Sequence, residues 1–362
     1  MRRGDRCSYI DEYGLPTPVP QSPAASAPQT GPSPEPPAPS PPSSDRLDDI
    51  ELTHIFLTKT YKTLWYREPV PSLWKGVAFE EALKEPALLG GILAISAMHV
   101  IATSDRPEKR YQVMALRNQA VALEGFVKLL PRITEETADA AFLLSVLVTH
   151  WAFASRSLPA ELGIFSTTHD YSAWTFHEAR HDKVSEVQDF VDIIRKTQPV
   201  RQLVFHGRPW LLGGKLAEMM KIPKSHELPV LPPFVDQALD KLLLRAEQES
   251  CVLLPLEKNG RPLLSLKLIY RISMRAEWAE GLMGWITCLP PEFVAQLETG
   301  ENMAMIMLSY WAVCMSVLDE RWWATGWGHA LVSEIAIRVG PEWAELADWP
   351  VKNYHWLKQG VD

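Results

Sequence analysis

The segment TEETADAAFLLSVLVTHWAFAS, residues 134–155, decides the fold class of this chain. Thr134 stands where a helix N-cap is expected, and Glu135 and Glu136 suit the positive end of a helix dipole. From Ala140 onward the segment is apolar on all sides, which is typical of a helix that is buried on every face. The sequence therefore predicts a central core helix with other helices packed around it.

Helical periodicity extends outward from this segment in both directions. It begins at Asp48 with an expected buried face of Ile50, His54, Leu57, Tyr61 and Leu64. Asp105 is expected to cap a helix that ends at Pro131, and further helices are expected from Val187, over 233–249 and over 262–280. The segment HGRPWLLGG, residues 206–214, is expected to interrupt the helical pattern.

The predicted fold class is all-α, because no series of alternating strand patterns is present. One hairpin around Asn259-Gly260 is the single candidate for β-structure. The apolar stretches 86–104, 140–155 and 302–318 are shorter than the ~20 apolar residues of a membrane span and contain polar residues, so we expect core helices.

Composition divides the chain into an arm and a body. Residues 13–45 hold twelve of the thirty prolines, together with Ser, Ala, Thr and Gln, and such a segment cannot bury a core. We therefore expect a disordered proline-rich linker over residues 11–46 and a helical domain over 47–362. The net charge of −8 argues against a nucleic-acid surface spread over the whole protein. The four widely spaced cysteines indicate reduced, intracellular thiols.

One motif suggests metal chemistry. Residues 177–181 match H-E-x-x-H, which on a helix places His177 and His181 on one face for zinc, with Glu178 beside the bound water. Val184 and Val187 stand where the extended motif has glycine and a third histidine. The chain also lacks a nucleophile elbow, a phosphate loop and a dinucleotide fingerprint. We predict that the protein is not an enzyme and has no catalytic residues, and keep a zinc metalloprotease as a remote alternative.

The strongest candidate for a ligand site lies near the carboxyl end, where nine of the fourteen tryptophans fall between Trp278 and Trp356. Methionine and aromatic walls suit an adaptable cavity for a flat apolar ligand. The predicted pocket residues are Met303, Met307, Trp311, Met315, Trp322, Trp323 and Gly326. Ordinary core packing is the rival interpretation, and Gly326 or Gly328 is expected to allow a positive φ in a tight turn. His99 and His150 lie in apolar helices and are assigned to packing.

Several blocks of sequence resemble one family. MRRGDRCSYI, residues 1–10, resembles the end of a fungal zinc binuclear cluster (Zn2Cys6), with Cys7 at the last ligand position. The blocks LLGGILAISAMHV, ALRNQAVALEGF, MLSYWAV, WWATGWG and EWAELADWP are similar to the regulatory domain of fungal sterol uptake control transcription factors. The likeness covers residues 48–156 and 187–350.

The resemblance implies a nuclear transcriptional regulator whose helical effector domain senses an apolar ligand such as a sterol. Such a regulator would control RNA polymerase II transcription of lipid, sterol or secondary-metabolite genes, acting as a homo- or heterodimer together with the transcription machinery. The chain as written carries one of the six zinc ligands, so we expect no cofactor in it. Zinc is expected only in a form with an intact cluster. DNA binding is likewise expected only from an intact cluster, in which Arg2, Arg3 and Arg6 would contact phosphates.

A second hypothesis belongs to another class. A protein without a DNA-binding module, with apolar helical surfaces, could dimerise with intact zinc-cluster regulators and compete with them or support them. This hypothesis and the ligand-sensing regulator share the same fold and differ in partner.

Overall fold

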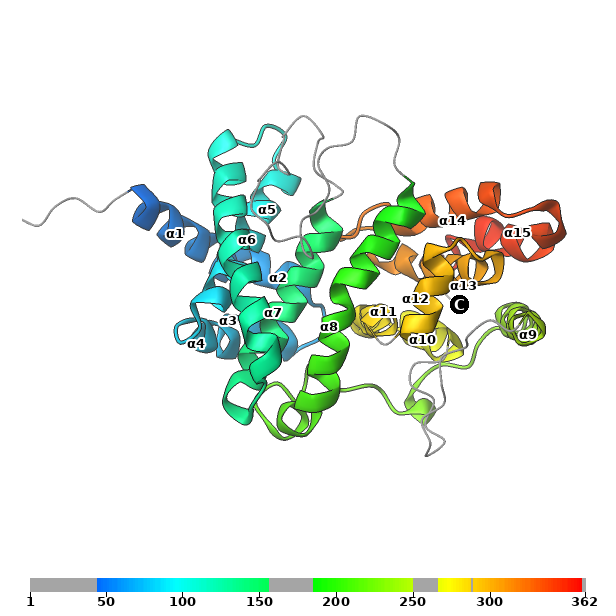
Figure 1. The fold of residues 1–362 in the computed structure, drawn as a ribbon, viewed down its shortest axis with the longest axis horizontal. Coiled ribbons are helices and arrows are strands. Elements are labelled where there is room, and N and C mark those ends of the chain that lie inside the picture. Colours follow the sequence, from blue (N-terminus) through cyan, green and yellow to red (C-terminus); the bar gives the residue numbers. More distant parts are fainter. Residues whose placement is uncertain (1–43, 156–184, 250–265, 288, 360–362) are drawn as a thin grey trace, which may run out of the picture. The chain divides into compact units, whose positions relative to one another are not determined.

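The computed structural model describes residues 44–155, 185–249, 266–287 and 289–359 (Figure 1). The described residues contain fifteen α-helices and several short 3-10 turns, with no strand among them, which confirms the all-α prediction. The zinc-cluster remnant, almost all of the proline-rich linker, the H-E-x-x-H segment and Asn259-Gly260 lie outside the described residues.

The body begins with short helical segments: α1 (Ser44–Ile55), a π-helical turn (Phe56–Thr60), α2 (Tyr61–Leu64), α3 (Val70–Lys75) and α4 (Val77–Ala82). The buried face of the first three segments consists of Leu52, Phe56, Thr60 and Leu64, whereas Ile50 is 63% exposed. Of the predicted face, Leu64 is fully buried, and Leu57 and Tyr61 are partly buried against the amino-terminal core. The prediction was wrong for Ile50 and His54, which are exposed. The wider π-helical turn keeps side chains four residues apart on the same side of the helix, which the 3.6-residue periodicity does not anticipate.

Helix α5 (Pro86–Thr103) packs between α6 (Lys109–Leu129) and α7 (Glu135–Ala154). Two adjacent glycines allow this close packing. A Cβ atom on Gly90 would lie 3.0 Å from the Asn118 carbonyl oxygen, and one on Gly91 would lie 3.0 Å from Leu144 Cδ1. Small residues at these positions therefore let both neighbouring helices approach α5 closely.

The predicted caps had different outcomes. Thr134 forms a capping box with Thr137, whose hydroxyl accepts a hydrogen bond from the Thr134 N–H at 2.9 Å, so the start of α7 is confirmed. Helix α6, in contrast, begins at Lys109 with Glu108 at the N-cap position and no side-chain cap, so the prediction for Asp105 was wrong. Asp105 instead belongs to the turn between α5 and α6.

By length and composition, α5 and α7 could each cross a membrane, and a bent pair of helices, Pro291–Glu298 with Asn302–Leu318, passes the same test. Within the protein, 67% of the apolar segment of α5 and 83% of the apolar segment of α7 are buried. The apolar surface of both helices therefore serves mainly to form the core.

Helix α8 (Glu186–Gly213) passes through Pro199 and Pro209 without ending. The predicted interruption at residues 206–214 was therefore wrong. Buried side chains on both sides of Pro199, among them Ile194 and Leu203, hold the helix in place although each proline removes one backbone hydrogen bond. Tertiary packing thus overrides the local signal.

The remaining helices are α9 (Pro233–Gln248), α10 (Leu266–Ser273), α11 (Met283–Thr287), α12 (Pro291–Glu298), α13 (Asn302–Cys314), α14 (Trp327–Arg338) and α15 (Ala344–Asn353). A 3-10 turn over Ala276–Leu282 joins α10 to α11.

The buried side chains form two clusters. The amino-terminal core includes Phe56, Trp74, Leu88, Phe126, Phe142 and Leu203. The carboxy-terminal core includes Phe153, Phe190, Trp285, Trp311, Trp323 and Trp327. Helices α7 and α8 pack against each other and contribute to both clusters. Together these two long helices connect the cores.

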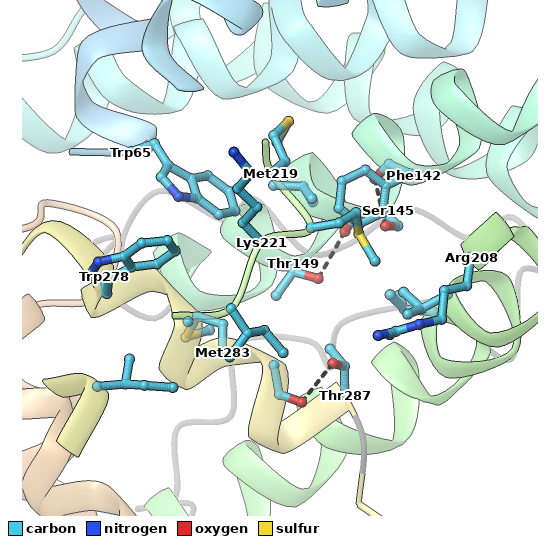
Figure 2. Close-up of a pocket in the computed structure, with 18 of the residues that line it drawn as sticks. Trp65, Phe142, Ser145, Thr149, Arg208, Met219, Lys221, Trp278, Met283 and Thr287 are labelled. Carbon is cyan, nitrogen blue, oxygen red and sulfur yellow. Dashed lines mark hydrogen bonds between the residues drawn. The ribbon is translucent and has the colours of Figure 1, made fainter. Parts of the chain in front are cut away.

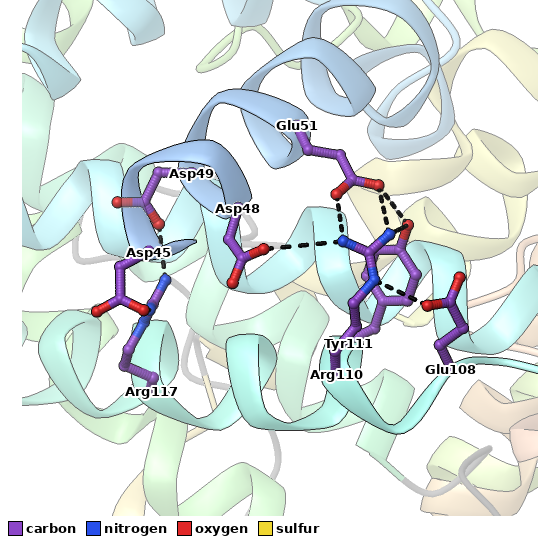
Figure 3. A network of polar contacts seen from close by, with 8 residues as sticks. All are labelled: Asp45, Asp48, Asp49, Glu51, Glu108, Arg110, Tyr111 and Arg117. Atoms are coloured by element: carbon purple, nitrogen blue, oxygen red, sulfur yellow. Dashed lines mark hydrogen bonds and ion pairs between the residues drawn. The ribbon is translucent and has the colours of Figure 1, made fainter. Parts of the chain in front are cut away.

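Helix α1 is attached to α6 by charge (Figure 3). The Arg110 guanidinium donates to both carboxylate oxygens of Glu51, at 2.6 and 3.0 Å, and the Tyr111 hydroxyl donates to Glu51 at 2.5 Å. About two turns further along α6, Arg117 binds Asp45 and Asp49 at 3.2 and 2.7 Å. The hydrogen bonds from Arg110 and Tyr111 lower the pKa of Glu51. The start of the body is therefore held by surface ion pairs to α6 in addition to the buried side chain of Leu52.

Candidate functional site

A pocket of about 190 Å³ opens where the two cores meet (Figure 2). We call it the seam pocket. Helices α7, α8 and α11 line it, together with the chain that follows α8 and the turn before α11. The walls are mostly apolar and come from both cores: Trp65, Phe142, Val146, Val200, Val204, Met219, Met220, Ile272, Trp278 and Met283.

One stripe of α7 faces the pocket. It consists of Phe142, Ser145, Val146, Thr149 and His150, which follow the i, i+3, i+4, i+7, i+8 spacing of a single helix face. Val146 is the only residue between Ala140 and Ala154 that is partly exposed rather than buried. The predominantly apolar helix α7 therefore turns its polar residues Ser145, Thr149 and His150 towards the seam pocket.

The hydroxyl groups in the pocket already donate their hydrogens to carbonyl groups of their own helices. Ser145 donates to Phe142 O at 2.6 Å, Thr149 to Ser145 O at 2.8 Å, and Thr287 to Gly284 O at 3.0 Å (Figure 2). Their oxygen lone pairs remain able to accept a hydrogen bond. These groups can therefore accept a hydrogen bond from a ligand but have no free hydrogen to donate.

His150 is a neutral part of the wall. Its Nδ1 lies 2.8 Å from the Val146 carbonyl oxygen, and the ring packs edge-on against Trp323 with centroids 4.3 Å apart. Burial lowers the pKa of His150 to about 4. The imidazole is therefore uncharged at neutral pH, in agreement with the packing role predicted for it.

Two cations lie on the rim of the pocket. Arg208 projects from α8 with its guanidinium towards the cavity, and Lys221 approaches from the chain after α8 (Figure 2). Lys221 forms an ion pair with Glu218, which also binds Arg67 at 3.5 Å. Arg208 forms no ion pair with any residue that the structure describes. The rim therefore carries two positive charges. Among the described residues, a carboxylate pairs with Lys221 but not with Arg208.

The predicted pocket residues lie elsewhere. Met303, Met307, Trp311, Met315 and Trp323 are at most 4% exposed and belong to the carboxy-terminal core, and none of them lines the seam pocket. In this cluster the rival interpretation, ordinary core packing, matches the geometry. The physical reason is that the methionine and tryptophan side chains fill the space between their own helices.

The tryptophan pair of this cluster forms a joint with α2. Trp322 Nε1 donates to Thr63 Oγ1 at 2.9 Å, and Trp323 Nε1 donates to the Thr63 carbonyl oxygen at 3.1 Å. Arg321 Nη1 donates to the same carbonyl at 3.0 Å. Trp322 also stacks on His99, and burial lowers the pKa of this histidine to about 4. The predicted residues thus lie directly behind the wall of the seam pocket, since Trp323 contacts His150.

The two glycines of this segment have different tasks. Gly326 adopts a φ of +76° at the N-cap of α14, as expected for one of the pair. Gly328 allows close packing, because a Cβ atom there would lie 2.5 Å from Tyr354 Oη and 2.6 Å from the Ala312 carbonyl oxygen.

Metal ligands do not gather in the described part of the chain: residues 44–155, 185–249, 266–287 and 289–359 contain no group of three or more His, Cys, Asp or Glu suited to a metal ion. Cys314 is fully buried, and burial raises the pKa of its thiol well above the usual range. Cys7, Arg2, Arg3 and Arg6 lie outside the described residues.

Comparison with protein-family models and with curated proteins gives no match for this chain. The geometry of the seam pocket and the sequence resemblance are therefore the grounds for a functional assignment.

Sequence reasoning missed the seam pocket, although part of the signal was present. Ser145, Thr149 and His150 interrupt an otherwise apolar helix on one face, which suggests a wall in contact with something other than aliphatic core. The other walls come from positions between Trp65 and Thr287 without a common motif. Only the tertiary structure brings them together.

Proposed function

We propose that the helical body is the ligand-sensing effector domain of a transcriptional regulator of the fungal zinc-cluster class, and that an apolar small molecule occupies the seam pocket. The observation that carries this proposal is an apolar pocket formed jointly by the two cores. The family resemblance supplies the nuclear, transcriptional context, in which contact with DNA belongs to an intact cluster.

The position of the pocket gives a physical route from binding to regulation. A ligand in the pocket contacts α7 and α8, which contribute to both cores. It therefore stabilises the arrangement in which the cores meet, by RT ln(1 + [L]/Kd) relative to states that do not bind. A regulator needs such a differential affinity for two states.

The volume limits what the pocket holds. Drug-sized ligands occupy roughly 300–1,000 Å³, and a cavity of about 150 Å³ holds one benzene ring. The 190 Å³ of the seam pocket accommodates the end of a sterol, with the remainder at the open mouth, or a smaller apolar ligand. Trp65 and Trp278 line the pocket, so a bound fluorophore would lie close to both indoles.

The test uses this proximity. The full chain is titrated with dehydroergosterol, and energy transfer from tryptophan reports binding. Val146→Trp fills the pocket from α7, whereas Val113→Trp makes the same change on the exposed side of α6, where Val113 is 67% exposed. We expect at least a tenfold loss of affinity for Val146→Trp and wild-type affinity for Val113→Trp.

Two further measurements complete the test. Near-UV circular dichroism and the melting temperature show whether Val146→Trp is folded. A folded Val146→Trp variant with wild-type affinity would place the ligand elsewhere. In cells, the full chain fused to a heterologous DNA-binding domain should drive a reporter gene in a sterol-dependent manner, and loss of this response in Val146→Trp but not in Val113→Trp would support the proposal.

A further inference from the structure

The charges around the seam pocket differ from those of the rest of the chain. The protein has 44 acidic and 36 basic residues, and its net charge is −8. Among the described residues that line the pocket, the charged ones are Arg208 and Lys221, and none is Asp or Glu. An apolar cavity with only cations at its rim favours a ligand that carries negative charge at one end.

Of the two cations at the rim, Arg208 is the one without a described carboxylate partner, so it can bind the negatively charged end of a ligand. Lys221 already shares Glu218 with Arg67. Arg208 forms no ion pair within the described part of the chain, and Figure 2 shows its guanidinium directed towards the cavity. A guanidinium presents two parallel N–H donors that match the two oxygens of a carboxylate. Arg208 can therefore bind a carboxylate at the mouth while the rest of the ligand lies inside.

The interior agrees with this orientation. The hydroxyl groups of Ser145, Thr149 and Thr287 already donate their hydrogens to carbonyl groups, so they offer no donor to an anion. A carboxylate inside the pocket would therefore lose its hydration without compensation, which is costly. The charged end must remain at the rim, and the apolar end must point inwards.

We propose that the ligand class of the seam pocket is a carboxylic acid with an apolar ring or chain of roughly 6 to 10 carbon atoms, bound with its carboxylate on Arg208. This inference rests on the proposed ligand-sensing function and narrows its ligand to an amphipathic anion. It distinguishes such an acid from a neutral sterol, whose hydroxyl carries no charge to pair with the Arg208 guanidinium.

The test compares octanoate with 1-octanol, which share chain length and differ in charge. Binding to the full chain is measured by isothermal titration calorimetry at low and at 0.5 M salt. We expect octanoate to bind at least tenfold more tightly than 1-octanol at low salt, and this advantage to shrink at 0.5 M salt. Arg208→Gln should reduce octanoate affinity roughly 10- to 100-fold and leave 1-octanol unchanged.

Arg132→Gln is the matched control, because Arg132 is an exposed arginine that does not line the pocket. It removes the same charge and should leave both affinities unchanged. Arg208 is itself exposed, so its substitution is compatible with folding, and the melting temperature verifies this.

The outcomes separate the two proposals. Equal affinities for octanoate and 1-octanol, or an Arg208→Gln variant that binds octanoate like the wild type, overturn the anion inference and leave the ligand-sensing pocket standing. Binding of dehydroergosterol without binding of octanoate would likewise overturn the anion inference and leave the ligand-sensing pocket standing. If octanoate, 1-octanol and dehydroergosterol all fail to bind the folded wild type, the proposed function is overturned as well.

Discussion

The carboxy-terminal core and the seam pocket are both rich in aromatic and methionine side chains, yet only one of them is hollow. In the core, Trp285 and Trp311 stack with ring centroids 5.5 Å apart, and the Trp311 N–H donates to the Leu282 carbonyl oxygen at 3.2 Å. Large rings there meet other large rings. At the seam, large side chains face small residues such as Ser145, Gly281 and Gly284.

The comparison shows that a cavity arises from a mismatch in size between facing surfaces. Tryptophan and methionine fill space efficiently when both surfaces contribute them, because packed interiors reach the density of organic crystals. Small residues on one side leave volume that the other side does not fill. Composition alone therefore does not distinguish a ligand pocket from a well-packed core.

Removing a tryptophan from each region should give the largest difference between them. Trp311 is fully buried, so Trp311→Ala should lower the free energy of unfolding by about 3–5 kcal/mol. Trp278 is half-buried at the pocket and stacks under the Arg67 guanidinium at 4.1 Å, so Trp278→Ala should cost only about 1 kcal/mol. Urea unfolding measures both values, and similar losses in the two variants would contradict the distinction.

The second largest effect should be a loss of stability in acid, caused by His150 at the seam pocket. Burial lowers the pKa of His150 from its ordinary value near 6.5 to about 4. Between these values the unfolded chain binds a proton that the folded chain excludes, so stability falls as the pH falls. The loss from this histidine amounts to about 3 kcal/mol between pH 6.5 and 4, with no further loss below pH 4.

The variant His150→Leu isolates this contribution. Urea unfolding at pH 7, 5.5 and 4 should show a shallower loss of stability in His150→Leu than in the wild type. His99, whose pKa burial also lowers to about 4, contributes a similar slope in both proteins and cancels in the comparison. An unchanged slope in His150→Leu would mean that the ring is protonated without unfolding.

How far the sequence predicts this structure depends on how local the signal is. Helix α7 was predicted from its cap and its apolar composition, because both lie within one segment. Helix α8 was predicted to end near residue 206, because a proline normally ends a helix, and only packing on both sides explains its continuation to Gly213. The buried face of α1 was missed, because Leu52 is buried there, whereas Ile50 and His54 are exposed.

The site was harder to predict than the fold. The methionine and tryptophan cluster suggested a pocket from composition, but its residues fill one another's space. The walls of the seam pocket come from segments as distant as Trp65 and Thr287, each of which is unremarkable by itself. Arg208 also lies within the segment that was predicted to be a break in the helix.

A third type of contact, surface charge, should give the smallest effect. Glu51→Gln weakens the ion pair between α1 and α6 and should lower stability by about 0.5–1 kcal/mol, with a smaller difference at 1 M salt. Hydrogen exchange should increase in α1 and remain unchanged in both cores. Glu124→Gln, which removes only the neighbouring Lys128 pair on α6, should leave the exchange of α1 unchanged.

The joint between Thr63 and residues 321–323 has a consequence for synthesis. Its hydrogen bonds connect positions 258 to 260 residues apart. At 5–20 residues per second, a ribosome needs roughly 13 to 50 s to produce the second half of this contact. During that interval the Thr63 carbonyl can accept hydrogen bonds from water but not from Arg321 or Trp323. The contact between α2 and residues 321–323 can therefore form only late in synthesis, after nearly nine tenths of the chain has been made.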